Sequence, residues 1–372
     1  MKNSILTGLF VTLCFGISLG QKKTNQLFQL SDPLATKETQ ALFFNLGKLS
    51  QTNVMIGHQD DMAYGVGWRG IKDKSDIKDV SGSYPAVFGW DISKIGKELN
   101  IDSVPFVSIR QWIAKAYGMN CVNTISWHED NPVTKNNAWD PTSAVAAIIP
   151  GGKFHDYYKS RLDEVAGFLG SLKSDKGEMI PVIFRPFHEH SGGWFWWGKG
   201  NCTANDFISL WRFTVDYLRK EKGLHNLIVS FSTDVFNSPE EFLSFYPGDE
   251  YVDMLGFDDY QSVKSYDGVE TLAKRLRMIV KIAESKGKIP AMTETGLESV
   301  PMADWWTNIL LKAIKTDEVT KRISYVLVWR NYTTKHHYAP YPGQASVSDF
   351  LKFKTDPLIL FQDKMPEIYH LN

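Results

Sequence analysis

The stretch MIPVIFRPFHEHSGGWFWWG, residues 179–198, joins an apolar run directly to a polar and aromatic segment. Its first eight residues are typical of a buried β-strand. A glutamate between two histidines, two glycines and four consecutive aromatic residues follow. No regular element buries four adjacent aromatic side chains on one face, because a strand alternates its side chains and a helix spreads them around its axis. The stretch therefore predicts a strand that opens at its carboxyl end into a functional loop.

Seven further apolar runs of this kind alternate with stretches of helical periodicity. The strands are expected at NVMIG (53–57), PAVFGWD (85–91), CVNTISW (121–127), NLIVSFS (226–232), VDMLGFD (252–258), IPAMTE (289–294) and SYVLVW (324–329). Helices are expected over about 36–51, 92–98, 102–117, 154–174, 203–222, 265–287, 301–317 and 348–362. Eight strands that alternate with helices predict an α/β fold, a closed (β/α)8 TIM barrel that forms a single domain over residues 21–372. A doubly wound open sheet is the alternative.

The amino terminus has the pattern of a signal peptide over residues 1–20. Lys2 precedes an apolar run, and Ser18-Leu19-Gly20 supplies a small-residue cleavage site. Soluble export to the periplasm or the medium is favoured over lipid anchoring, because Leu13 precedes Cys14 where a lipoprotein signal has a small residue. Removal of this segment leaves Cys121 and Cys202, whose pairing the sequence leaves open.

Composition narrows the class of partner. The chain has 372 residues and a formal net charge of −1 without a basic block, which disfavours nucleic acid. It contains 12 tryptophans, a residue that often lines sugar-binding surfaces. We expect a monomer that binds neither nucleic acid nor a membrane.

Polar and aromatic residues gather where the predicted strands end. They occur in GHQDD (57–61), WD (90–91), WHE (127–129), RPFHE (185–189), DDY (258–260) and WRN (329–331), and at Glu294. All strands of a (β/α)8 barrel open at one face, where active sites lie. Glu189 follows the fourth strand and Glu294 ends the seventh, so the two carboxylates are expected to face each other. Such a pair, about 5–5.5 Å apart, is what retaining glycoside hydrolysis requires.

With these motifs the chain resembles glycoside hydrolase family 26, whose members are mostly β-mannanases. VIFRPFHEHSGGWFWWG (182–198) is similar to the acid/base signature of that family, and TETG (293–296) is similar to its nucleophile segment. Further matches are GHQDD (57–61), SWHEDNP (126–132), DDY (258–260), VWRN (328–331) and YAPYPG (338–343). The resemblance covers nearly all of the chain after residue 20, in the same order.

The resemblance implies a role for each matching residue. Glu189 would be the acid/base and Glu294 the nucleophile of a double displacement on β-1,4-mannan, galactomannan or manno-oligosaccharides. Neither a cofactor nor a metal is implied. The substrate-binding residues would be His128, Arg185, His188, Trp194, Tyr260, Trp329 and Arg330. Among them, His188 would contact the 2-hydroxyl region, Trp194 would be a sugar platform, and Tyr260 would donate a hydrogen bond to Glu294.

The mode of attack stays open at this stage. The long loop from Ala63 to Tyr84 carries Trp68 and Arg69, and it is a candidate wall that would make the enzyme release mannobiose from chain ends. An open cleft with endo attack is the alternative. Gln344 stands where many such mannanases have a histidine, so a contact at the glycone end is expected to differ.

Three other functions are compatible with parts of the sequence. The same barrel and mechanism would serve mixed-linkage β-glucan or β-1,3-xylan. A metal-dependent hydrolase would use His188, His190 and His128 with Asp60 and Asp61, although no H-E-x-x-H motif occurs. A glycan-binding protein without activity is the third, disfavoured because both glutamates are present. Several other residues are expected to serve structure alone: Glu298 at the surface, His336 and His337 in a solvated loop, and Trp305 and Trp306 in helix packing.

Overall fold

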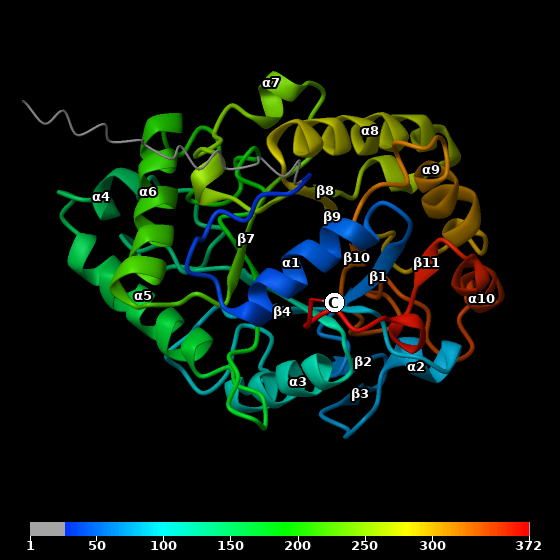
Figure 1. Cartoon of the computed structure of the whole chain (residues 1–372). Coiled ribbons are helices and arrows are strands. Elements are labelled where there is room, and N and C mark those ends of the chain that lie inside the picture. The colour runs from blue at the N-terminus through cyan, green and yellow to red at the C-terminus, as the bar shows by residue number, and fades with distance from the viewer. Residues whose placement is uncertain (1–26, 372) are drawn as a thin grey trace, which may run out of the picture.

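The computed structural model describes residues 27–371, so the predicted signal peptide lies outside the described residues. Eight parallel strands form a closed barrel inside a ring of helices (Figure 1). The strands are β1 (Val54–Gln59), β4 (Val87–Asp91), β5 (Val122–Trp127), β6 (Val182–Pro186), β7 (Leu227–Thr233), β8 (Met254–Asp259), β9 (Ile289–Thr295) and β10 (Tyr325–Val328). Because β10 pairs with β1, the sheet has no open edge there. The predicted (β/α)8 barrel is confirmed, and the alternative prediction of a doubly wound open sheet is wrong.

The helices follow the predicted alternation with two exceptions. They are α1 (Lys37–Leu49), α2 (Asp76–Ser81), α3 (Phe106–Gly118), α4 (Val145–Ile148), α5 (His155–Gly170), α6 (Ala204–Asp216), α7 (Pro239–Phe242), α8 (Val269–Lys286), α9 (Lys312–Ile314) and α10 (Val347–Thr355), with π-helical turns at Tyr217–Glu221 and Trp306–Leu311. The helix expected over 92–98 is absent, because Lys94 and Gly96 adopt positive φ and break the helical path. The helix expected over 348–362 ends at Thr355, because Pro357 disfavours helical backbone at Asp356. The strand β11 (Ile359–Leu360) follows and pairs with β1.

Apolar side chains fill the interior of the barrel at its amino-terminal end. Met55, Val122, Ile228 and Ile289 point inward from four strands and form one buried cluster. The apolar side chains of α1 belong to the same cluster, and Figure 1 shows this helix lying across the barrel. Since apolar residues close this end, the polar residues at the opposite end are free to form a site.

A larger cluster packs the helices against the outside of the barrel. It includes Trp305 and Trp306, both fully buried, as predicted. Cys121 is buried and Cys202 is half-buried, and both thiols are free, so the disulfide that the sequence left open is not formed. Within residues 27–371, we find no helix that is long and apolar enough to cross a membrane.

Candidate active site

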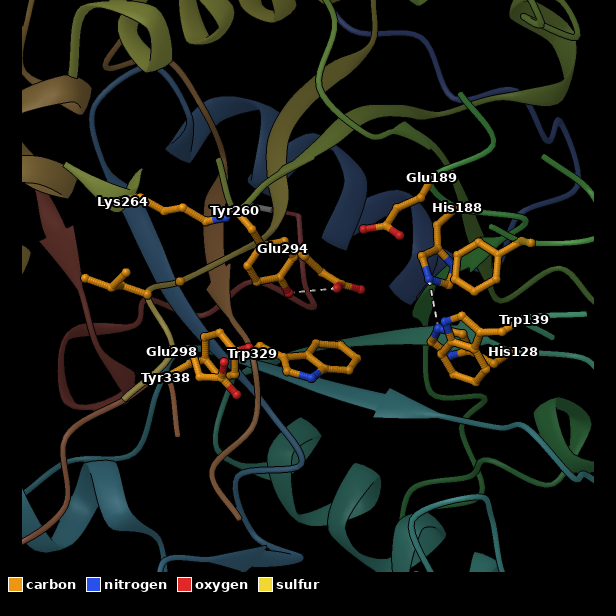
Figure 2. A pocket seen from close by; sticks show the side chains of 13 residues that line it. His128, Trp139, His188, Glu189, Tyr260, Lys264, Glu294, Glu298, Trp329 and Tyr338 are labelled. Atoms are coloured by element: carbon orange, nitrogen blue, oxygen red, sulfur yellow. Dashed lines mark hydrogen bonds between the residues drawn. The ribbon is translucent and has the colours of Figure 1, made fainter. Parts of the chain in front are cut away.

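The carboxyl ends of the strands surround a cavity of about 530 Å³. It is lined by His128, Trp139, His188, Glu189, Phe195, Tyr260, Lys264, Glu294, Gly296, Leu297, Glu298, Trp329 and Tyr338 (Figure 2). Six of the nine predicted site residues belong to this lining: His128, His188, Glu189, Tyr260, Glu294 and Trp329. Arg185 is buried and bonded to Glu294, whereas Trp194 and Arg330 lie outside the lining.

Glu189 and Glu294 extend toward each other across the cavity (Figure 2). A carboxylate oxygen from each, together with one from Asp258, falls within a group whose members all lie within 4.8 Å of one another. A limit of 4.8 Å between these oxygens is compatible with the roughly 5–5.5 Å between the carboxyl groups of retaining glycosidases and lies below the roughly 6.5–9.5 Å of inverting ones. The geometry therefore favours direct attack by one carboxylate over activation of an intervening water.

A β-bulge brings Glu294 into the cavity. Between Met292 and Glu294, β9 carries one residue more than its neighbour β8, and it has an extra residue against β10 as well. Such a bulge changes the direction in which the following side chain points. As a result both Thr293, which donates to Asp258 Oδ1 at 2.6 Å, and Glu294 reach the mouth of the barrel.

Two donors hold the Glu294 carboxylate. The hydroxyl of Tyr260 donates to its Oε2 at 3.0 Å, as the resemblance implied, and Nη2 of Arg185 donates to its Oε1. A charged and a neutral donor on separate oxygens stabilise the anion and fix its orientation. These contacts suit a carboxylate that acts as a nucleophile.

Glu189 has the opposite environment. Burial and the neighbouring charges of Asp258 and Glu294 raise its pKa well above the ordinary value, and a hydrogen bond from the Trp194 indole opposes the shift. Its backbone has a φ of 51°, and its N–H donates to Ser232 O at 3.1 Å. An unusual backbone conformation held by a neighbouring strand is the kind of local strain found at functional sites. The protonated side chain is thus positioned as a general acid.

Arg185 provides a buried positive charge beside Glu294 and Asp258. It is 3% exposed and donates to Asp258 Oδ2 at 3.0 Å as well as to Glu294. Burial raises the pKa of Asp258 well above its usual range, Arg185 lowers it, and Glu294 raises it again. One guanidinium therefore links two buried carboxyl groups, and the site depends on it.

We predict that Arg185→Met will lower the free energy of unfolding by about 3–5 kcal/mol, because its two buried carboxyl groups would lose their counter-charge. Chemical denaturation at neutral pH measures this loss. Lys321→Met, which removes an exposed ion pair with Glu318, is the control and should cost less than about 1 kcal/mol. Equal stability of the Arg185→Met protein and the wild type would show that proton uptake by the carboxyl groups replaces the arginine.

A chain of hydrogen bonds fixes the two histidines. Nδ1 of His128 lies 2.6 Å from Asp91 Oδ2, and its Nε2 lies 3.1 Å from Nε2 of His188. Burial and the charge of Arg185 lower the pKa of His188 well below its usual value, so it is neutral. When His128 is neutral and donates from Nδ1 to Asp91, its Nε2 accepts from the Nε2–H of His188. The contact of His188 with a 2-hydroxyl group stays a prediction.

The donor set does not favour a metal site. Glu189, Asp258 and Glu294 are the one group with metal-ligand spacing in the described part of the chain, and Arg185 already bonds two of them. Of the ligands named for the metal-dependent alternative, only His128 and His188 meet at the cavity, whereas His190 and Asp61 have other partners. His190 packs against Phe207 and Phe231, with ring centroids 4.7 and 4.5 Å away. Asp61 forms a hydrogen bond with His58, whose Nδ1 lies 2.7 Å from Oδ1 of Asp61.

The four consecutive aromatic residues divide into three anchors and one rim residue. Phe195, Trp196 and Trp197 are buried, and the indoles of the two tryptophans donate to Glu129 O and His188 O, each at 2.9 Å. Trp194 is 40% exposed. Its predicted role as a sugar platform stays a prediction, since it contacts Glu189 and is not part of the cavity lining.

Arg330 lies in a cluster that joins three loops. It donates to the Tyr64 hydroxyl at 3.1 Å and pairs with Asp102. The predicted wall from Ala63 to Tyr84 folds into the hairpin of β2 (Tyr64–Gly65) and β3 (Trp68–Arg69) followed by α2.

Asp60 lies beside this cluster and accepts a hydrogen bond from the Tyr64 hydroxyl. Burial and the charge of Asp102 raise the pKa of Asp60 to about 8.

Several lining residues escaped the sequence analysis. Trp139 stacks on His128 with ring centroids 5.1 Å apart, and an isolated tryptophan in a polar loop was the available signal. Lys264 and Leu297 follow later strands without a distinctive local pattern. Tyr338 begins the matched motif YAPYPG, to which the sequence analysis assigned no role. Glu298 is exposed as predicted, and it also borders the cavity.

The prediction of a solvated His336–His337 pair is wrong for one member. His337 is 2% exposed and packs against Tyr341, whereas His336 is partly exposed and pairs with Glu298. The Gln344 side chain donates to the backbone oxygen of Val300 at 3.0 Å, and the expected difference in a glycone contact stays a prediction.

Comparison with known proteins decides the family. The model of glycosyl hydrolase family 26 matches residues 31–336. The chain belongs to glycosyl hydrolase family 26. A solved family 26 β-mannanase of Bacteroides ovatus is 42% identical, with a TM-score of 0.87, and the match covers 90% of this chain and 98% of that one. A family 26 structure from Muricauda is 36% identical, with a TM-score of 0.86, over 92% of this chain and 96% of that one.

A mannan endo-1,4-beta-mannosidase of Bifidobacterium adolescentis is also similar, at 35% identity over 72% of this chain. The matched region spans 28% of that relative's own length. This chain therefore corresponds to one part of a longer relative.

Proposed function

We propose that the chain is a retaining β-mannanase, which hydrolyses β-1,4-mannosidic bonds in mannan, galactomannan or manno-oligosaccharides. The observation that carries the proposal is the opposed pair of glutamates, one surrounded by donors and the other in a site that favours its protonated form. The choice of mannan rests on the similarity to enzymes described as β-mannanases. Mixed-linkage β-glucan and β-1,3-xylan are the alternatives.

In the first step Glu294 attacks the anomeric carbon and Glu189 gives its proton to the glycosidic oxygen. The bond between that carbon and oxygen breaks, and an ester between the sugar and Glu294 forms. In the second step ionised Glu189 takes a proton from water, whose oxygen attacks the anomeric carbon and releases Glu294. Glu189 thus ends protonated and Glu294 ionised, as they began.

A short digestion of linear β-1,4-mannan, with products separated by length, tests this proposal, with Glu294→Ala as the inactive control. A ladder of mixed oligosaccharides that the control lacks is expected for endo attack. Mannobiose alone from the earliest time would indicate chain-end attack and assign the barrier to the Ala63–Tyr84 loop. Products from β-glucan or xylan but not from mannan would overturn the substrate. Binding of mannan without any product would overturn the proposal that the chain is an enzyme. Loss of activity in the presence of a chelator would favour the metal-dependent alternative.

We also propose that the chain is exported, with cleavage after Gly20, and works as a monomer in the periplasm or the medium. The support is the pattern of residues 1–20. Amino-terminal sequencing of the mature protein should begin at Gln21, and its mass in solution should be that of one chain. An uncleaved, membrane-held product would contradict soluble export.

A further inference from the structure

Trp194 makes a contact that its predicted role as a sugar platform does not explain. Its indole Nε1 donates to Glu189 Oε2 at 2.9 Å, so the rim residue bonds the proposed acid directly. An indole N–H donates and does not accept. In a protonated carboxyl group the carbonyl oxygen is the better acceptor, so the oxygen that accepts from the indole is the one without the proton.

The loop that carries Trp194 is held at several points. Lys199 N–H donates to His190 O at 2.7 Å, and the Asn201 side chain donates to Gly193 O at 3.0 Å and Phe195 O at 2.7 Å. Together with the buried Trp196 and Trp197, these bonds fix the loop on both sides of Trp194.

Gly192 provides the space in which the indole lies. A Cβ added at Gly192 would lie 2.2 Å from Cη2 of Trp194, which is far below contact distance. The six-membered ring thus rests directly over this glycine. Gly192 has no positive φ, so an alanine there displaces the indole without straining the backbone conformation.

We propose that Trp194 is a positioning residue, which holds Glu189 through Oε2 and so places the catalytic proton on Oε1, the oxygen that protonates the leaving group. The inference rests on the proposed function, because it assigns a partner to the acid of that reaction. The same hydrogen bond stabilises the ionised form and opposes the burial that raises the pKa of Glu189.

Two variants remove the hydrogen bond in different ways, and the first of them retains the aromatic surface. Trp194→Phe keeps an aromatic ring and removes the N–H, whereas Gly192→Ala keeps the indole and displaces it. We expect both variants to lower kcat/KM on mannotetraose by about tenfold at the plateau of the pH profile. This is a fraction of the full effect of a general acid. Both should also move the alkaline limb of the pH profile to higher pH, because the ionised form loses a donor.

An activated substrate gives the control. On 2,4-dinitrophenyl β-mannobioside kcat/KM should stay within about twofold of the wild type, because this leaving group departs without a proton. A wild-type alkaline limb in both variants, or a rise in KM alone, would overturn the proposal and favour a sugar platform. Failure of the wild type to cleave mannotetraose would instead overturn the proposed function. Equal melting temperatures establish that the variants fold.

Discussion

Glu294→Ala should lower kcat/KM on β-1,4-mannan by at least about 10⁴-fold, because the substitution removes the group that forms the covalent intermediate. Glu294 accepts from Tyr260 and Arg185, and neither donor can replace it as a nucleophile. Steady-state product release measures the loss. Residual activity above about 1% of the wild type would show that another group attacks the sugar.

Azide distinguishes this role from a structural one. The space that Glu294→Ala leaves on the α face admits azide, which displaces dinitrophenolate from 2,4-dinitrophenyl β-mannobioside in a single inversion. We expect an α-mannobiosyl azide and a rate that rises with azide concentration. No rescue in a folded variant, or a β-azide, would contradict the assignment of Glu294 as the nucleophile.

Glu189→Ala should lower kcat/KM on mannan by about 10²–10⁴-fold, the usual contribution of a general acid. Toward 2,4-dinitrophenyl β-mannobioside, the first step should stay fast and the second should become slow, because no base activates water. Stopped-flow absorbance should show a burst of about one dinitrophenolate per active site. Azide should remove the slow phase and yield a β-mannobiosyl azide, the opposite anomer to that from Glu294→Ala. Absence of both the burst and the rescue would contradict the role.

The pH dependence of the wild type follows from the same residue. The pKa of Glu189 is raised, so the acid stays protonated to a higher pH than an ordinary glutamate does. Activity on mannan should therefore persist through the range in which exposed glutamates are ionised and fall as the pH rises through the raised pKa. In Glu189→Ala this alkaline limb should disappear. A wild-type profile that already falls at the pKa of an exposed glutamate would contradict the environment described for this residue.

The strands were predictable because all eight are buried in the barrel and therefore share the same apolar pattern. A strand of a buried parallel sheet has a largely apolar run of residues, and each of the eight predicted runs lies on a barrel strand. Helix ends were less predictable. The segment 92–98 has a helical pattern but turns at Lys94 and Gly96, whose positive φ values the pattern does not reveal.

Within the site, the sequence by itself determined which residues end the strands. Glu189, Glu294, His128, His188, Tyr260 and Trp329 meet at the cavity because parallel strands open at one face, so order along the chain was enough to bring them together.

Only the tertiary structure decided how these residues are used. The bulge in β9 that turns Glu294 into the cavity depends on pairing with β8 and β10, and the Arg185 bridge between Asp258 and Glu294 joins three strands. Trp194 looked from its neighbours like a sugar platform, yet the fold brings its N–H to Glu189. Local sequence fixes the period and direction of a strand, whereas pairing register and loop closure depend on residues far away along the chain, and these set the charge and orientation of the catalytic groups.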